Sequence, residues 1–371
     1  MKVVVAADAG SGRAPASYDA QSLAGALSRR DHDVRLVTAS PADVAATGDY
    51  RIIRMPVTEA EPGAPMPMIS EMGSFLVDEY AGEPPDVVLS HGWVYGMAAA
   101  LAANRRPVAT VQAFAGVSDR DRASETAVRI ETLLARNASM VTALCSDDMH
   151  KIVRLGAPRS RVGMLPCGID VDAFTAAPAQ RGGARHRIVA LVDDLAAPRG
   201  VGHLIAALPA VPSAELFVLG AGAPDGEAMH QVLAHARRSG VGARTHVLSA
   251  DGDTDVAAWL GSADVAVLPS PYDPDPRLAL TAMACGAAVV AVDTGGPRDA
   301  VVADVTGLLV PPGHPRALSR ALRSVLAQNV LREGMGLAGR ARARSRYSWD
   351  RIAVDAELIF QAVTRRDAVF A

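Results

Sequence analysis

The sequence predicts an α/β protein that consists of two doubly wound parallel sheets joined by a short linker. Short apolar runs rich in valine and alanine alternate with helical stretches from the first residues onward. These runs are apolar throughout, as expected for parallel strands that are covered on both faces. The rhythm stops in a proline- and glycine-rich segment between residues 166 and 187 and then restarts. Half of the residues are hydrophobic, so each of two domains can bury a core.

The first half opens with a strand, a glycine-containing loop, a helix and a second strand, which is a βαβ unit. Later apolar runs and helical stretches continue this order to about residue 155. The expected strands are 3–6, 34–38, 87–89, 108–111 and 140–143, and the expected helices are 20–29, 96–104, 124–137 and 146–155.

The second half repeats this order and ends in helices. Ser348 is expected to cap a last helix that reaches about Arg366. We expect domains at 1–170 and 188–347, a linker at 171–187, and a terminal helix, 348–371, that packs back on the first domain. The expected strands are 188–192, 216–219, 245–248, 264–269, 278–285 and 289–292, and the expected helices are 201–208, 227–239 and the stretches after Pro315.

Charge and cysteine content exclude several classes of protein. The net charge is −3 and no block of lysine and arginine is present, so a nucleic-acid partner is not expected. Cys145, Cys167 and Cys285 form no Cys-x-x-Cys pair, which argues against a disulfide framework or a zinc ribbon. No signal peptide and no run of 18 apolar residues is present. These observations together predict a cytoplasmic protein.

Two glycine pairs follow predicted strands and are candidates for contact with a nucleotide. Gly10 and Gly12 follow the first strand, but Pro15 stands where a dinucleotide fingerprint needs a third small residue. A plain strand-to-helix turn is therefore favoured there. Gly220 and Gly222 end a later strand, where they would let a nucleotide base lie against the backbone, and turn chemistry accounts for them equally well.

One acidic stretch, 251–255, imitates a calcium-binding loop. Val256 stands where that loop needs glycine, and Ser262 stands where it needs a bidentate acid. No metal site is therefore expected.

One run of residues is specific for a family. Residues 280–291 read LTAMACGAAVVA, and Gly295-Gly296 and the segment 306–311, TGLLVP, follow. This pattern resembles the donor half of family 4 retaining GT-B glycosyltransferases. Further matching segments lie in the same order along nearly the whole chain: 90–93, 155–161, 166–170 and 347–351.

The resemblance implies two Rossmann-like domains that face a cleft. It implies transfer of a sugar, of the hexosyltransferase type, from a nucleoside diphosphate sugar donor to an unknown acceptor. The reaction would proceed with retention and without a required metal or other cofactor. Residues 1–170 would form the acceptor side, and residues 188–347 would bind the nucleotide sugar.

Several departures from the family pattern fall on the donor site. Two glutamates, eight residues apart in the family, correspond to Asp273 and Thr281. In the family the first lies by the donor sugar and the second accepts hydrogen bonds from the ribose. Thr281 would offer one hydroxyl in place of a carboxylate. Pro276 replaces the glycine of that loop and has no N–H to give to a phosphate.

The cation that the family places at the end of the first donor-domain strand is also changed. Its Gly-Arg corresponds to Asp193-Asp194, and its basic residue before a glycine corresponds to Arg199-Gly200. Unit charges about 4 Å apart at an effective dielectric near 20 interact by about 4 kcal/mol, so an acid in place of arginine opposes a diphosphate strongly.

On the acceptor side the family's first histidine is kept as His91, beside Trp93. Its second histidine corresponds to Ala115, and its glycine loop is reduced to Gly12 with Arg13 nearby.

Three interpretations follow. The first is a working transferase in which Arg199, Arg277 and the amides near Leu278 and Ala279 stabilise the leaving diphosphate, and Asp273 positions the sugar. The second is a catalytically silent GT-B module that binds a partner transferase, a glycan or a nucleotide. The third is another enzyme on a two-domain α/β frame, such as a nicotinamide-dependent one. Oligomeric state and contact with a membrane surface or a partner protein are left open.

Overall fold

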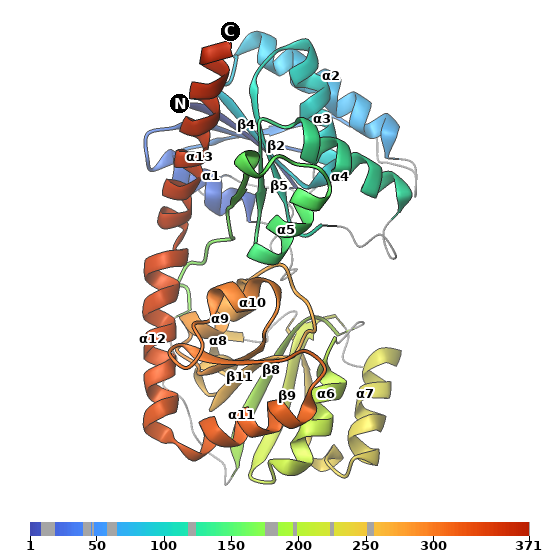
Figure 1. Cartoon of the computed structure of the whole chain (residues 1–371), viewed down its shortest axis with the longest axis vertical. Helices are drawn as coiled ribbons and strands as arrows, with labels where there is room; N and C mark the ends of the chain where they lie inside the picture. Colours follow the sequence, from blue (N-terminus) through green and yellow to red (C-terminus); the bar gives the residue numbers. More distant parts are fainter. Residues whose placement is uncertain are drawn as a thin grey trace. The chain divides into compact units, whose positions relative to one another are not determined.

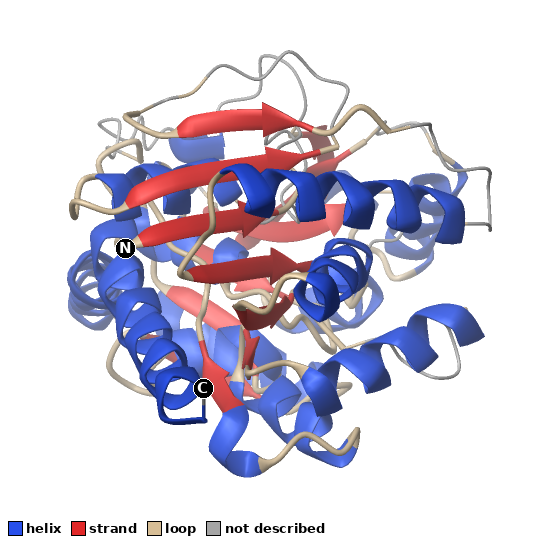
Figure 2. Ribbon diagram, turned by 90° about the horizontal axis from the view of Figure 1, so that it is seen from above, coloured by secondary structure: helices blue, strands red, loops and turns tan. Residues whose placement is uncertain are grey.

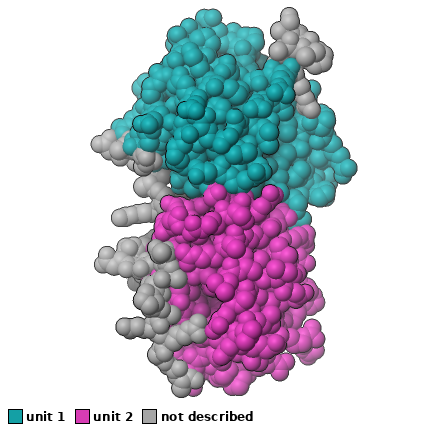
Figure 3. All heavy atoms as spheres, turned by 90° about the vertical axis from the view of Figure 1, so that its left-hand side faces the viewer, with its two compact units in different colours: residues 1–12, 17–168, 349–371 teal, residues 13–16, 169–348 magenta. Residues whose placement is uncertain are grey.

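The chain forms two compact units, and the C-terminal segment returns to the first of them (Figures 1 and 3). The computed structural model describes residues 1–8, 19–39, 46, 48–57, 65–117, 124–174, 185–195, 199–222, 226–250 and 256–370, with side chains to residue 365. Within these ranges the first unit comprises the chain up to Gly168 together with the segment from Trp349 onward. The second unit comprises Ile169–Ser348.

The first unit contains a seven-stranded sheet, counted over the described residues, in the order β3-β2-β1-β4-β5-β6-β7. Every neighbouring pair of these strands is parallel. The strands are β1 (Lys2–Ala6), β2 (Asp33–Thr38), β3 (Arg51–Arg54), β4 (Val87–His91), β5 (Ala109–Phe114), β6 (Met140–Ala143) and β7 (Val162–Met164).

Helices cover both faces of this sheet (Figure 2). Val3 and Val5 of β1 share a core with residues of helices α1 and α13, whereas Val4 between them packs with α2 and α3. The helices of this unit are α1 (Ala20–Ser28), α2 (Met66–Gly82), α3 (Gly92–Arg105), α4 (Glu125–Asn137), α5 (Ser146–Arg154) and α13 (Trp349–Phe370).

The terminal helix α13 belongs to the core of the first unit. Ile352, Ala356 and Phe360 are buried against the β1 face, and α13 lies along α1. Arg30 on the loop after α1 pairs with Glu357 at 2.6 Å. The last helix therefore completes the cover of one sheet face.

The second unit contains a six-stranded sheet in the order β10-β9-β8-β11-β12-β13, again parallel throughout among the described strands. Its strands are β8 (His186–Asp194), β9 (Ala214–Ala221), β10 (Thr245–Ser249), β11 (Val265–Leu268), β12 (Val289–Val292) and β13 (Gly307–Val310). Its helices are α6 (Val201–Ala207), α7 (Glu227–Arg238), α8 (Val256–Gly261), α9 (Arg277–Ala284), α10 (Gly295–Ala300), α11 (Pro315–Ala327) and α12 (Asn329–Tyr347).

The prediction of a strand over 278–285 is wrong, because these residues lie in helix α9. An apolar run of eight residues fits a buried strand and a buried helix equally well, and periodicity alone does not separate the two. Burial of α9 explains the run, since Ala279, Leu280, Ala282, Met283 and Ala284 are all enclosed.

No helix in the described part of the chain is long and apolar enough to cross a membrane. The three cysteines are buried, and none of them forms a disulfide.

Candidate functional site

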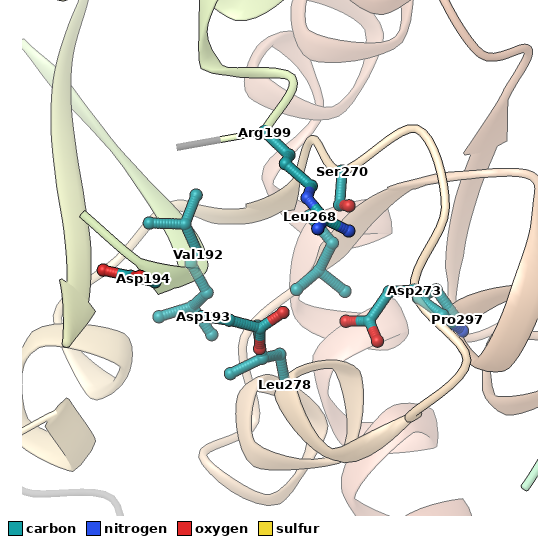
Figure 4. A pocket seen from close by; sticks show the side chains of 10 residues that line it. Val192, Asp193, Asp194, Arg199, Leu268, Ser270, Asp273, Leu278 and Pro297 are labelled. Atoms are coloured by element: carbon teal, nitrogen blue, oxygen red, sulfur yellow. The ribbon is translucent and has the colours of Figure 1, made fainter. Parts of the chain in front are cut away.

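A pocket of about 180 Å³ opens in the second unit where strands β8 and β11 end. Ligands of open parallel sheets bind at this edge, beyond the carboxyl ends of the strands. Figure 4 shows the side chains around the pocket. The lining residues within the described chain are Leu191, Val192, Asp193, Asp194, Arg199, Leu268, Ser270, Asp273, Leu278 and Pro297.

Two adjacent acids at the end of β8 point in different directions. The carboxylate of Asp193 points toward Asp273, whereas the carboxylate of Asp194 points to the opposite side (Figure 4). A Cβ on Gly222, at the end of β9, would lie 3.4 Å from Asp194 Oδ1. The β8–β9 register shifts between Leu191 and Asp194, an irregularity of the kind that redirects side chains near functional sites. The acid that faces Asp273 is therefore Asp193.

The loop after β11 buries Asp273 and holds it from two sides. Asp273 is 8% exposed, and its Oδ1 accepts the backbone N–H of Asp275 at 2.9 Å. The backbone N–H of Gly296 donates to the Asp273 carbonyl at 2.8 Å. Gly295 has a φ of +58°, and a Cβ there would lie 2.0 Å from the same carbonyl oxygen. The start of α10 therefore fixes the backbone that carries Asp273.

This environment favours the protonated form of Asp273. Burial raises its pKa to about 8, and the charges of Asp193 and Asp275 add to the effect. The N–H of Asp275 and the charge of Arg199 oppose it. Near neutral pH the carboxyl of Asp273 is mostly a hydrogen-bond donor.

The pKa of Asp193 is also raised, although part of the surface of Asp193 is open to solvent. The largest cause is desolvation by the surrounding protein, and the next largest is repulsion from the charge of Asp275. Arg199 and Arg277 partly offset these causes.

The two arginines near the pocket are held differently. Arg277 pairs with Asp275 through its guanidinium at 2.8 Å and donates its backbone N–H to Asp275 Oδ1 at 2.9 Å. The amide of Arg277 is thus already used. Arg199 lines the pocket and, within the described residues, forms no ion pair or side-chain hydrogen bond. Arg199 is therefore the better placed cation for an incoming anion.

Gly200 explains how Arg199 reaches the pocket. Its φ is +79°, and a Cβ there would lie 1.8 Å from the carbonyl oxygen of Pro269. Only glycine permits this close approach of the chain before α6 to the end of β11.

Helix α9 places the remaining predicted residues of the donor side. Leu278 lines the pocket, and Ala279 is fully buried. The hydroxyl of Thr281 donates to the carbonyl of Arg277 at 3.0 Å, and Thr281 is not among the described lining residues of the pocket, so its contact with a ribose stays a prediction. Pro276 stands just before the first helical residue, so it removes no amide from within α9.

Gly220 has a packing role. A Cβ there would lie 2.6 Å from a methyl group of Val192 and 2.9 Å from its carbonyl oxygen. Gly220 is buried and is absent from the described pocket lining. Contact of Gly220 with a nucleotide stays a prediction.

The predicted acceptor-side residues lie in the first unit. His91 ends β4 and precedes the first residue of α3. Trp93 is half-buried and packs between the two hydrophobic clusters on either side of α3. Gly12 and Arg13 lie outside the described residues, as do Gly10 and the acidic stretch 251–255.

Ser270 and Pro297 line the pocket and were not predicted from the sequence. Of the two acids that end β8, the sequence pointed to Asp194, and the pocket lining contains Asp193 as well. Neighbouring residues in a strand point to opposite faces, so only one of Asp193 and Asp194 can face Asp273. Strand alternation predicts that the two acids point to different sides. The register shift between β8 and β9 determines that Asp193 is the acid that faces Asp273. Among the described residues, no group of three His, Cys, Asp or Glu side chains is arranged to hold a metal ion.

Both halves of the chain match sequence profiles of sugar-transferring enzymes. Residues 16–168 match the Glycosyl transferase 4-like domain, and residues 179–342 match Glycosyl transferases group 1. A D-inositol 3-phosphate glycosyltransferase of Geodermatophilus obscurus is 31% identical, over 77% of this chain and 69% of that protein. The chain belongs to the family 4 GT-B glycosyltransferases.

Solved structures show the same fold as this glycosyltransferase. Sucrose-phosphate synthase from Thermosynechococcus elongatus superposes with a TM-score of 0.81 at 21% identity, covering 99% of this chain and 100% of that one. Anabaena HepE, solved with UDP, superposes with a TM-score of 0.78 at 19% identity, covering 98% and 100%. The predicted GT-B fold class with two Rossmann-like domains is confirmed.

Membership of the family also confirms that the protein is a glycosyltransferase. Matched relatives are named D-inositol 3-phosphate glycosyltransferase or glycogen synthase, which are names of enzymes, so a silent binding module is not favoured.

Proposed function

We propose that this glycosyltransferase takes its sugar from a nucleoside diphosphate sugar bound in the pocket beyond β8 and β11, and transfers it with retention. The observation that carries the proposal is that Arg199 and the buried carboxyl of Asp273 line the same pocket. HepE, which shares the fold, has been solved with UDP and with UDP-glucose.

The reaction breaks the bond between the anomeric carbon and the diphosphate oxygen, and the diphosphate leaves with the bonding electron pair. The acceptor hydroxyl oxygen forms the new bond on the same face of the sugar, and its proton passes to the leaving diphosphate. Charge that develops on the leaving diphosphate has to be met by a fixed positive group. In this proposal Arg199 supplies that charge, together with the backbone amides near Leu278 and Ala279 in the first turn of α9, where Leu278 lines the same pocket.

Asp273 positions the donor sugar in this proposal. A buried neutral carboxyl can donate one hydrogen bond and accept another, which suits a sugar hydroxyl. Thr281 offers an oxygen to a ribose hydroxyl. His91 and Trp93 are proposed for the acceptor side, together with Gly12 and Arg13. No metal or other cofactor enters these steps.

The acceptor is proposed from the relatives. The matched relative from G. obscurus acts, by its name, on D-inositol 3-phosphate, a polyol phosphate. This compound is therefore the first acceptor to test.

Binding of UDP-, GDP- and ADP-sugars, measured by calorimetry and thermal shift, tests the donor. A ligand at 100 times its dissociation constant should add about 2.7 kcal/mol of stability. Arg199→Ala should weaken binding of the active nucleotide sugar by about ten- to a hundredfold, since a hydrogen bond to a charged group contributes about 1.5–3 kcal/mol.

The matched control is Arg238→Ala, because Arg238 is an exposed arginine at the end of α7, outside the described pocket lining. It should bind like the wild type. If the protein binds none of the UDP-, GDP- and ADP-sugars, the proposed donor is rejected.

A further inference from the structure

The donor pocket carries more acid than cation. Asp193, Asp194 and Asp273 line it, and Arg199 is the one cation among the described lining residues. A nucleoside diphosphate sugar brings two further negative charges. Arg199 alone does not balance this set, so the pocket needs another way to lower its charge when the donor binds.

Two of these acids face each other across the pocket. The carboxylates of Asp193 and Asp273 point toward one another (Figure 4). Asp273 is 8% exposed, and within the described residues neither acid forms an ion pair shorter than 4 Å. Asp193 keeps an exposed surface, so burial acts mainly on Asp273, and the charge of Asp193 facing it further favours the protonated form of Asp273. The two acids therefore titrate as a coupled pair.

The other arginines around Asp193 and Asp273 are already bound to other acids and so do not neutralise the pair. The second cation, Arg277, is held by Asp275 at 2.8 Å, and Arg298 of α10 is held by Asp293 at 2.8 Å. Both acids already have a raised pKa in the free protein, to about 8 for Asp273. The groups to consider are Asp193 and Asp194 on β8, Arg199 before α6, Asp273 and Asp275 after β11, Arg277 on α9, and Asp293 with Arg298 at α10.

On the proposed function that this pocket binds the donor diphosphate, we propose that Asp193 and Asp273 act as one acid pair that holds a proton against the bound diphosphate. Donor binding then takes up a proton from solvent and weakens in alkaline solution. The proton bound by the pair turns a repulsive carboxylate into a donor of a hydrogen bond to a diphosphate or sugar oxygen. The pair thus takes on part of the role that an arginine has in the family pattern.

Calorimetry with UDP-glucose, GDP-mannose and ADP-glucose in two buffers of different ionisation enthalpy measures the proton uptake directly. With an Asp273 pKa of about 8 in the free protein and a higher one in the complex, linkage predicts uptake of about three-quarters of a proton at pH 8.5. The same linkage predicts affinity about fourfold weaker at pH 8.5 than at pH 6.5.

Two variants and a matched control assign the proton. Asp273→Asn should abolish the uptake and make the affinity independent of pH over this range. Asp193→Asn removes the main charged neighbour of Asp273 and should shift the uptake to lower pH. Asp194→Asn should keep the uptake, because that carboxylate points away from the pair.

The outcomes separate this inference from the function on which it rests. Binding of none of the three sugar nucleotides at either pH overturns the proposed donor. Binding with the same proton uptake in the wild type and Asp273→Asn, or with no uptake at pH 8.5, overturns the acid pair while the donor assignment stands.

Discussion

Substitution of Gly295 by alanine should damage the donor pocket from outside it. Gly295 begins α10 with a φ of +58°, and an added Cβ would lie 2.0 Å from the carbonyl oxygen of Asp273. Non-bonded atoms of this kind sit at about 3.4 Å or more, so the two must separate by about 1.4 Å. Because the loop that carries Asp273 rests on this contact, we expect the loop to move.

The structure allows an estimate of the cost. A left-handed backbone costs an alanine about 1–2 kcal/mol. Loss of the hydrogen bond from Gly296 to the Asp273 carbonyl costs about 1 kcal/mol, and crowding adds about 1–3 kcal/mol. Gly295→Ala should therefore lower the free energy of unfolding by about 3–6 kcal/mol. A displacement of about 1 Å at Asp273 should lower the rate of sugar transfer by up to about a hundredfold.

Gly286→Ala is the matched control. Gly286 has a φ of +75° but nothing within 4 Å of an added Cβ. Gly286→Ala should therefore lower the free energy of unfolding only by the cost of a left-handed backbone. Urea unfolding gives the two stabilities, and calorimetry with the nucleotide sugar gives the two affinities. Equal losses of stability in both variants, with unchanged donor affinity in Gly295→Ala, would refute the role assigned to this contact.

Three further predictions concern charge. Arg35→Ala should lower the free energy of unfolding by about 3–5 kcal/mol in urea titrations, since fully buried Arg35 holds Glu79 at 2.7 Å; a loss below 1 kcal/mol would contradict this. Asp273 has a folded-state pKa above its unfolded value, so its stability contribution is complete at low pH and declines as pH rises toward 8, at most by about 1.4 kcal/mol per unit. Unfolding of wild type and Asp273→Asn compared at pH 5 and 8 should show a steeper decline in the wild type, and parallel curves would argue against it. Asp193→Asn should strengthen diphosphate binding, measured by calorimetry, more than Asp194→Asn does, because the carboxylate of Asp193 faces Asp273; the reverse order would show that Asp194 lies nearer to the diphosphate.

Strong apolar periodicity made much of the fold predictable. Strands such as β1, apolar after Lys2, and β12, apolar throughout, are short runs that the structure places in the interior of parallel sheets. Edge strands gave no such signal, because β3 is Arg-Ile-Ile-Arg and β7 has three residues. Helix α2 was missed since Pro67 lies in its first turn, where proline is tolerated but reads as a break.

The sequence predicted which residues form the site better than it predicted where their side chains point. The sequence placed Asp273, Arg199 and Leu278 near the donor, and the pocket brings these three together. It could not show which acid of the pair at the end of β8 faces Asp273, because a register shift of the backbone sets that direction. Nor could it show that Asp275 occupies both the side chain and the amide of Arg277, since this depends on the path of one loop.

A crystal structure with a bound nucleoside diphosphate sugar tests the central claim most directly. We predict that a diphosphate oxygen lies within about 3 Å of the Arg199 guanidinium, and that the sugar contacts the carboxyl of Asp273. A diphosphate bound elsewhere in the chain, or one held in this pocket without contact to either side chain, would contradict the account.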